Sequence, residues 1–182
     1  MSASIQIQAI DDSQAALLSE LAKDIYPPHY PYLWNEGGVE WYIHEYAYQI
    51  EKITKELQDP NNLHYIVYVE GKPVGYLKIN INTTSKNFDP ATTMELERIY
   101  IYNNAVQKGI GTTLINFTNQ LAKQYQKQFI VLKAMDSAHK ALKFYEKHGY
   151  TIVGNYRLPD EVFTLMKPEY RGMYILKAIV PL

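Results

Sequence analysis

The sequence predicts an α/β (α+β) fold, a single domain with a mixed central β-sheet and helices on both faces. Three observations predict it. The 182 residues suffice for one domain of ordinary size, which we place over residues 1–182. Segments of alternating apolar residues are interleaved with segments of helical spacing. Their order is β-α-α-β-β-β-α-β-α-β-β, so antiparallel hairpins and a β-α-β crossover share one sheet.

The N-terminal third is predicted to be one strand followed by two helices. Residues 4–10 alternate between Ile and Gln, as in a half-buried strand. Two aspartates and Ser13 can cap the first helix. Its apolar face consists of Leu17, Leu18, Leu21 and Ile25. Three prolines exclude a helix over residues 26–32. Beyond Gly38, apolar residues at helical spacing predict one long helix that continues to about Gln58.

The middle of the chain changes to strand-like patterns. Residues 63–69 and 74–81 predict a hairpin around a turn at 70–73. A polar loop, a third strand and a connector follow at residues 83–90, 93–102 and 103–108. The C-terminal part returns to a helix-strand alternation, with a helix from Ile110 to about Tyr125, a strand over 129–134 and a helix over 137–148 that Gly149 ends. Residues 151–156 and 173–180 are predicted to be the last strands.

Composition narrows the classes of function. The net charge of −1 argues against a nucleic-acid-binding domain. The absence of cysteine excludes thiol nucleophiles and Cys-based metal sites, and it fits a reducing, cytoplasmic location. We expect no metal, no secretory signal and no membrane span. The 17 tyrosines indicate a lined pocket or a partner surface, or simply a Tyr-rich core.

A glycine-rich helix start is the first chemical motif. Gly109-Ile110-Gly111 follows a predicted strand and connector and opens a helix, where free N–H groups and the helix dipole favour an anion such as a pyrophosphate. Lys108 adds a positive charge beside it. Neither the P-loop pattern nor the dinucleotide-binding fingerprint is complete here, since Leu114 stands where the latter needs a third Gly or Ala.

A second segment makes the pattern specific. The stretch ALKFYEKHGY (141–150) follows the crossover strand, and together with VQKGIG (106–111) it resembles the two cofactor motifs of the GCN5-related N-acetyltransferase (GNAT) superfamily. The element order of that superfamily matches the predicted order from end to end. Two positions depart from its pattern: Val106 replaces the usual Gln or Arg, and Ala138 replaces a frequent Asn. We expect a side-chain hydrogen bond to the cofactor to be lost at each of these positions, whereas a backbone cradle does not depend on them.

The resemblance implies roles for individual residues, with acetyl-CoA as co-substrate. The cofactor-binding set it implies is Ile99, Tyr100, Ile101, Gln107, Lys108, Gly109, Ile110, Gly111, Thr112, Ala138 and Lys147. The strand residues would pair their backbone with the pantetheine arm, and the helix-start amides would hold the pyrophosphate. Tyr145 would protonate the departing thiolate, unless it is a packing residue.

A general base is also expected, because attack on a thioester needs a neutral amine. Glu97 occupies a strand position where the superfamily often has a carboxylate, and Glu95 is the substitute. Strand alternation predicts that Glu95, Glu97, Ile99 and Ile101 lie on one side of the strand, next to the acetyl group. A partner for Arg98 or a solvated carboxylate is the alternative role for Glu97.

The run ELERIYI (95–101) further resembles the PaiA-type spermidine/spermine acetyltransferases. The segment 26–51 mixes carboxylates with aromatic rings, which suits an amine cation. Candidate substrate contacts are Glu36, Tyr30, Trp34 and Trp41. The leading hypothesis is therefore direct acetyl transfer, in a ternary complex, to a primary amine of a small polyamine-like metabolite.

Two alternatives stay open at this point. A peptide or protein N-acetyltransferase would want an open groove in place of an aromatic lid. A non-catalytic acyl-CoA-binding module would not need Tyr145 or Glu97. The expected partner is a small amine, with neither nucleic acid nor membrane, and a homo-oligomer is compatible with the sequence.

Overall fold

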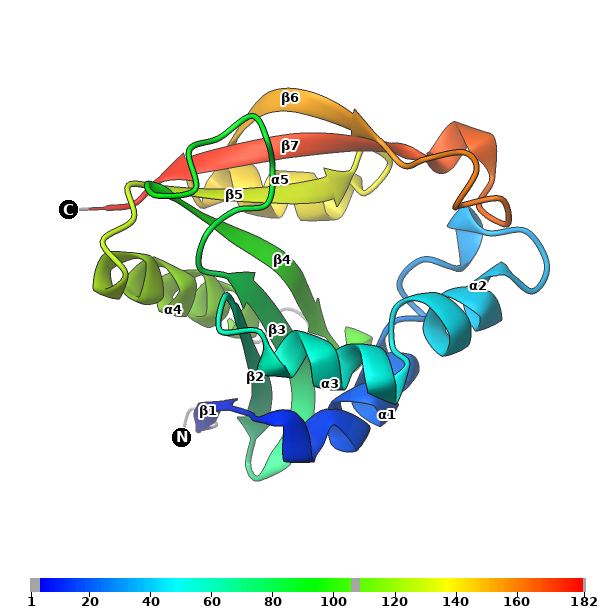
Figure 1. Cartoon of the computed structure of the whole chain (residues 1–182), viewed down its shortest axis with the longest axis horizontal. Helices are drawn as coiled ribbons and strands as arrows, with labels where there is room; N and C mark the ends of the chain where they lie inside the picture. Colours follow the sequence, from blue (N-terminus) through cyan, green and yellow to red (C-terminus); the bar gives the residue numbers. More distant parts are fainter. Residues whose placement is uncertain (1–3, 106–108, 182) are drawn as a thin grey trace.

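One mixed β-sheet runs through the molecule (Figure 1). The computed structural model describes residues 4–105 and 109–181. Within them, seven strands pair in the order β1-β2-β3-β4-β5-β7-β6. Their bounds are β1 (Ile5–Ala9), β2 (Asn62–Val69), β3 (Lys72–Asn80), β4 (Thr93–Ile101), β5 (Phe129–Met135), β6 (Thr151–Arg157) and β7 (Gly172–Ile179). Neighbouring strands are antiparallel except β4 and β5, which are parallel. The predicted mixed sheet and its strands are confirmed.

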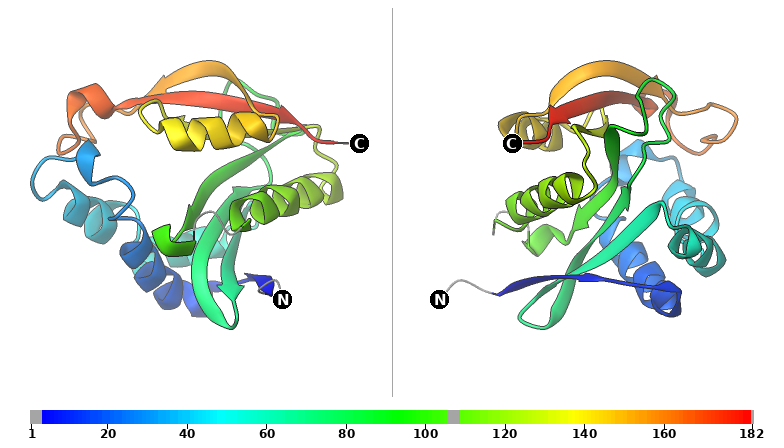
Figure 2. Two further views of the ribbon diagram at one scale, coloured as in Figure 1. Left: turned by 180° about the vertical axis from the view of Figure 1, so that it is seen from behind. Right: turned by 60° about the vertical axis from the view of Figure 1, so that its left-hand side comes forward.

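Helices cover both faces of this sheet (Figure 2). One face carries α1 (Ala15–Ile25), α2 (Gly38–Trp41) and α3 (Ile50–Gln58), and the other carries α4 (Ile110–Gln124) and α5 (His139–Lys147). Each layer has its own core. On the α4/α5 side Leu114 and Tyr145 pack with Leu96 and Leu132, whereas the α1–α3 side combines aliphatic residues with aromatic rings such as Trp34 and Tyr48. Among the described helices, none combines the length and apolar character that a membrane crossing needs.

Helix α1 buries a narrower stripe than predicted. Leu18, Leu21 and Ile25 are buried together with Ala22, at the i, i+3, i+4, i+7 spacing of a core-facing helix. Leu17 is 40% exposed and was wrongly included in the apolar face. It precedes the stripe by one position, which turns its side chain about 100° away from Leu18.

The single long helix predicted over residues 38–58 is also wrong, because the chain bends before α3. Helix α2 passes into a π-helical segment (Tyr42–Tyr46), and α3 begins after an extended Gln49 with φ −61° and ψ 138°. Tyr48 lies at the bend and is buried, with its hydroxyl 2.6 Å from that of Tyr76 on β3. Anchoring this ring and hydroxyl in the core requires the bend, and the apolar spacing alone does not reveal it.

Strands β4 and β5 pair only over their first residues and then diverge (Figure 1). Thr93–Glu95 pairs with residues 129–131, after which β4 remains paired with β3 and β5 with β7. We call this divergence the fork. The second half of β4 therefore has an edge that no strand of the described residues covers, and its backbone groups are open to the space inside the fork.

Candidate active site

A cavity of about 140 Å³ lies at the fork. Its walls come from β4 (Leu96, Glu97, Ile99, Tyr100), from β5 (Leu132, Lys133, Ala134, Met135) and from α5 (Ala141, Tyr145). The remaining lining residues include Tyr26, Tyr30, Leu33, Tyr42, Leu158, Phe163, Met166 and Met173. The cavity is thus mostly apolar and aromatic, with two charged side chains, Glu97 and Lys133, on its walls. Such a combination is typical of a small-molecule site.

The open edge of β4 presents the backbone groups of alternate residues. The Tyr102 amide donates to the Val74 carbonyl at 2.9 Å, and Tyr100 pairs with Tyr76 on the same side. In an antiparallel ladder the residues between them direct their N–H and C=O groups the other way. Ile99 and Ile101 therefore offer their backbone to the fork, as the predicted pairing with a pantetheine arm requires.

Tyr100 differs from its two neighbours. Its backbone faces β3, so the predicted backbone contact of Tyr100 to the cofactor is not supported, while its side chain lines the cavity. The Ile101 carbonyl already has one partner, the Nε2 of His29 at 2.8 Å. His29 thereby fastens the segment that carries Tyr30 to the end of β4.

A β-bulge corrects the predicted alternation along β4. Lys78 pairs with Arg98 and Ile79 with Leu96, so Glu97 is an extra residue in β4. Ile99 and Ile101 pack on the α4 side of the sheet, and Glu95 and Glu97 bond with residues of the opposite face. The prediction that these four side chains share one side is therefore wrong. The bulge re-aims the Glu97 carboxylate, and simple alternation cannot anticipate it.

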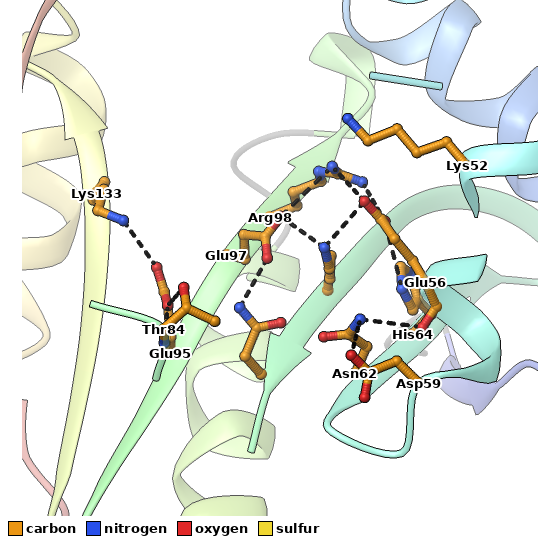
Figure 3. Close-up of polar contacts among 12 residues, drawn as sticks. Lys52, Glu56, Asp59, Asn62, His64, Thr84, Glu95, Glu97, Arg98 and Lys133 are labelled. Atoms are coloured by element: carbon orange, nitrogen blue, oxygen red, sulfur yellow. Dashed lines mark hydrogen bonds and ion pairs between the residues drawn. The ribbon is translucent and has the colours of Figure 1, made fainter. Parts of the chain in front are cut away.

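The Glu97 carboxylate is held by two hydrogen-bond donors and a neighbouring cation. Lys78 Nζ and Asn80 Nδ2 each donate to it at 2.8 Å, and the Arg98 guanidinium lies 3.5 Å away (Figure 3). Burial alone would raise the pKa of Glu97, but the charges of Arg98 and Lys78 and the hydrogen bonds from Lys78 and Asn80 outweigh it and lower the pKa to about 2. Glu97 is thus an ionised carboxylate at any working pH and binds a proton weakly.

Glu95 lies at the point where the fork opens. It is buried, accepts hydrogen bonds from Thr83 and Thr84, and forms an ion pair with Lys133 of β5 at 3.3 Å. The pair ties β4 to β5 where their pairing ends (Figure 3). Glu97 lines the cavity, whereas Glu95 is engaged in holding the fork together.

Tyr145 reaches the cavity from α5. Its ring is largely buried and packs against those of Phe144 and Tyr150, at centroid distances of 5.5 and 5.7 Å. Burial, together with the nearby hydroxyls of Tyr30 and Tyr150, raises the pKa of Tyr145 above its ordinary value. The phenol is therefore protonated, as a proton donor must be. Tyr145 both packs against neighbouring rings and lines the cavity. The two predicted roles, proton donor and packing residue, are therefore compatible.

The start of α4 has amides that receive no acceptor from the helix itself. Gly109 has φ +76°, and the first intrahelical bond runs from the Thr113 amide to the Gly109 carbonyl at 3.0 Å. The amides of Ile110, Gly111 and Thr112 therefore have no partner within the helix. The predicted contacts of Gln107 and Lys108, and the departure from the family pattern at Val106, lie outside the described residues.

Gly109 and Gly111 are favoured for different structural reasons. A Cβ on Gly109 would meet no atom of the described residues within 4 Å, so the positive φ is the reason for glycine that the structure gives there. A Cβ on Gly111 would lie 3.0 Å from the Phe144 ring of α5. A side chain at 111 would thus push against the Phe144 ring, so glycine there serves the packing of α4 on α5 in addition to any close approach of a ligand.

A histidine missed by sequence reasoning joins the two helices near this site. His148 Nδ1 donates to the Phe144 carbonyl at 2.8 Å, and Nε2 lies 3.1 Å from the Thr112 hydroxyl. For two other residues that are predicted to bind the cofactor, no contact among the described residues indicates a role. Ala138 precedes α5 as its N-terminal cap position, and Lys147 is exposed in its last turn.

The four residues predicted to contact the substrate lie in different surroundings. Tyr30 lines the cavity, and burial raises its pKa to about 12. Trp34 is buried between Trp41 and Tyr42, at ring distances of 6.1 and 5.2 Å. Glu36 is exposed at the surface. The aromatic lid is thus mainly a core, and the predicted contacts of Glu36, Trp34 and Trp41 stay untested predictions that the placement does not favour.

Other lining residues came from a part of the chain without any motif. Phe163 and Met166 belong to the β6–β7 connection, which meets residues 33–35 through backbone bonds. Asn35 N donates to Leu165 O at 2.9 Å, and Lys167 N donates to Leu33 O at 2.9 Å. No sequence signal marks this pairing, because it depends on where two irregular segments meet in space.

Residues 18–150 match the acetyltransferase (GNAT) family. The chain belongs to this family. It is 25% identical over 130 residues to an uncharacterized N-acetyltransferase in the pepI 3' region of Lactobacillus delbrueckii subsp. lactis, which is 71% of this chain and 72% of that protein. As a GNAT protein it is an acetyl-CoA-dependent N-acetyltransferase, and the resemblance stated from the two motifs is confirmed.

Solved structures of GNAT proteins share its fold. The PaiA N-acetyltransferase of Thermoplasma acidophilum, in complex with coenzyme A, has a TM-score of 0.74 and 19% identity over 97% of this chain and 99% of its own. A spermidine N-acetyltransferase SpeG chimera from Vibrio cholerae and hSSAT has a TM-score of 0.68 and 15% identity, over 96% and 95%. The open edge of β4 and the free amides of α4 fit a long thioester with a pyrophosphate.

Proposed function

We propose that the protein transfers the acetyl group of acetyl-CoA to a primary amine of a small cationic, polyamine-like metabolite, by direct attack in a ternary complex. The observation that carries this proposal is the fork cavity. An open strand edge, a protonated phenol and an ionised carboxylate all border the same small space. These are the groups that a thioester, a departing thiolate and an incoming ammonium each need.

The donor would lie along β4. The backbone groups of Ile99 and Ile101 would bond the pantetheine arm, and the amides of Ile110, Gly111 and Thr112 would bind the pyrophosphate with the help of the α4 dipole. Neither contact depends on the side chains that differ from the family pattern. The acetyl carbonyl would then be placed inside the fork, between Glu97 and Tyr145.

The reaction would proceed in one displacement. The amine nitrogen attacks the thioester carbonyl, so a C–N bond forms and the C–S bond breaks. Tyr145 gives its hydroxyl proton to the thiolate sulfur, whose ordinary pKa is about 8.5. Burial disfavours the phenolate, but it disfavours a thiolate at the same place as well. The proton lost by the amine passes to water, and water returns a proton to the Tyr145 phenolate, so the enzyme ends in its starting state.

Glu97 would serve as a fixed negative charge. A carboxylate with a pKa of about 2 is a poor direct base for an ammonium. It would instead hold the arriving ammonium, orient the water that takes its proton and stabilise the positive charge that develops on nitrogen during attack. Between the two carboxylates considered from the sequence, lining of the cavity favours Glu97 over Glu95.

A cationic acceptor fits the rest of the wall. Tyr26, Tyr30, Tyr42 and Phe163 offer ring faces on which a second ammonium or an alkyl chain can rest. The spermidine acetyltransferase among the similar structures supports the same class. The backbone bonds between residues 33–35 and the β6–β7 connection favour a small acceptor over an extended peptide, because they bridge one side of the cavity.

The test is a panel of acceptors with acetyl-CoA, read by release of free thiol and by mass of the product. Spermidine, spermine and short diamines should be acetylated, with kcat/KM at least tenfold above that of neutral-tailed amines and of peptides with a free N-terminus. A preference for the peptides would contradict the proposed small cationic acceptor and identify a peptide N-acetyltransferase instead. Binding of CoA without thiol release on any amine would favour the non-catalytic module.

A further inference from the structure

Behind Glu97 a chain of buried charges extends to helix α3 (Figure 3). Glu56 projects from α3 and forms ion pairs with Arg98 at 3.1 Å and with Lys78 at 3.2 Å. Lys78 and Arg98 in turn contact Glu97 at 2.8 and 3.5 Å. The two cations are thus shared between two carboxylates, of which Glu97 lines the cavity.

These four groups are largely withdrawn from water. The Lys78, Arg98 and Glu56 side chains are 6%, 13% and 14% exposed, whereas Glu97 is 30% exposed. At this depth charges are weakly screened and act over several ångströms. The formal charges of the four cancel, two positive against two negative. Lys52 lies beside the group and donates to the Tyr46 carbonyl at 2.8 Å, so it adds a further cation.

Resting on the proposed function, we infer that Glu56 is a positioning residue of the active site, which keeps the Glu97 carboxylate negative toward the cavity by neutralising Lys78 and Arg98 from behind. Without Glu56, two buried cations and Lys52 would face Glu97 alone. Their field would cancel the attraction of Glu97 for an ammonium and draw its carboxylate away from the cavity. Glu56 would thus act on the acceptor without touching it.

The contact geometry gives Glu56 a specific part in this. Its two oxygens receive both terminal nitrogens of Arg98, a bidentate arrangement that fixes the guanidinium plane. Cζ, the central carbon of the Arg98 guanidinium, also lies 5.4 Å from the centre of the Tyr48 ring. His64 is buried 3.8 Å from Glu56, but burial, only partly offset by Glu56, lowers its pKa to about 4, so it adds no charge at neutral pH.

The experiment compares Glu56→Gln with Glu51→Gln, an exposed carboxylate in the first turn of the same helix. With spermidine as probe, Glu56→Gln should raise the KM of the amine roughly tenfold, the effect of one buried charge at about 10 Å. The KM of acetyl-CoA should change less than twofold. Glu51→Gln should match the wild type in both, and Glu56→Asp should recover part of the amine affinity.

Charge balance provides a second variant in case Glu56→Gln folds poorly. Glu56→Gln combined with Arg98→Met removes one charge of each sign, and replacing both partners of a buried pair is better tolerated than replacing one. Its amine KM should return to within about threefold of the wild type. A purely structural role would lower the thermal stability of Glu56→Gln without this selective rise and recovery.

The outcomes separate the two proposals. If the wild type acetylates spermidine and the amine KM of Glu56→Gln equals that of Glu51→Gln, Glu56 has no positioning role. If the double variant is as impaired as Glu56→Gln, charge balance is not the cause and the inference is overturned. If the wild type acetylates no cationic amine at all, the proposed function itself fails.

Discussion

Glu97 and Tyr145 border the same cavity, but their surroundings shift their pKa values in opposite directions. Arg98 and Lys78 outweigh burial at Glu97 and keep it ionised, while burial keeps Tyr145 protonated. A pair of titratable groups whose environments move their pKa values apart is the arrangement expected of an acid and an anion that act together. Both settings are properties of the fold around the residues, since the ordinary pKa values of a glutamate and a tyrosine would not separate them so far.

Glu97→Gln tests the fixed-charge role. Because the pKa of Glu97 is lowered to about 2, its charge does not change between pH 5 and 9. The rise of kcat/KM with pH should therefore report deprotonation of the acceptor amine alone. We expect Glu97→Gln to lower kcat/KM about 10²-fold at every pH in this range, with the shape of the profile unchanged. A profile whose acidic limb disappears in the variant would instead identify Glu97 as the titrating base.

Tyr145→Phe tests proton donation to the thiolate. We expect kcat to fall by about 10²–10⁴-fold while the dissociation constant of CoA changes less than twofold. The matched control is Tyr150→Phe, five residues further on, whose buried hydroxyl has no hydrogen-bond partner in the structure described. Losing an unpaired hydroxyl should leave kcat nearly unchanged. Equal activity of the two variants would make Tyr145 a packing residue only.

At the scale of elements, helix α4 shows most clearly how the structure adds a second role to residues that the sequence motif assigns to ligand binding. The motif Gly109-Ile110-Gly111 indicates two glycines that admit a ligand, but Gly111 also receives the Phe144 ring. A bulky substitution at Gly111 would therefore disturb the packing of α4 on α5 as well as any bound pyrophosphate. At Gly109 a side chain would meet no described residue, which makes it the better position for a test.

Gly109→Asp and Gly109→Asn form a matched pair at this position. Asn and Asp are similar in shape, and both tolerate a positive φ better than most residues. The added carboxylate should repel a pyrophosphate at the α4 N-terminus. By calorimetry we expect Gly109→Asp to bind CoA at least tenfold more weakly than Gly109→Asn, with similar melting temperatures. Equal affinities would place the pyrophosphate elsewhere.

At the scale of the whole molecule, the sequence predicted the order of the elements but not the detailed shape of the site. Period-2 and period-3.6 patterns located the strands and most helices, and two glycine-containing motifs identified the family. The bend at Tyr48, the bulge at Glu97 and the meeting of residues 33–35 with the β6–β7 connection were not predictable. Each depends on a contact between distant segments, which leaves no local period in the chain.

The same dependence on distant contacts explains why the candidate substrate residues lie apart. Carboxylates and rings of the segment 26–51 are predicted to gather at a pocket, whereas in the structure Trp34 is buried, Trp41 is half-buried against it and Glu36 lies at the surface. The charges that reach the cavity belong to β4 and β5 instead. Local composition identified the aromatic character of the wall, and only the fold decides which side chains face the substrate.

Two-substrate initial-rate kinetics test the central claim, that one displacement in the fork cavity moves the acetyl group directly from acetyl-CoA to the amine. With the best acceptor varied against acetyl-CoA, double-reciprocal lines should intersect, and no stoichiometric thiol release should occur without amine. The absence of cysteine from the chain already removes the most nucleophilic side chain for a covalent relay. Parallel lines, with an acetyl group retained on the protein after mixing with acetyl-CoA alone, would contradict direct transfer.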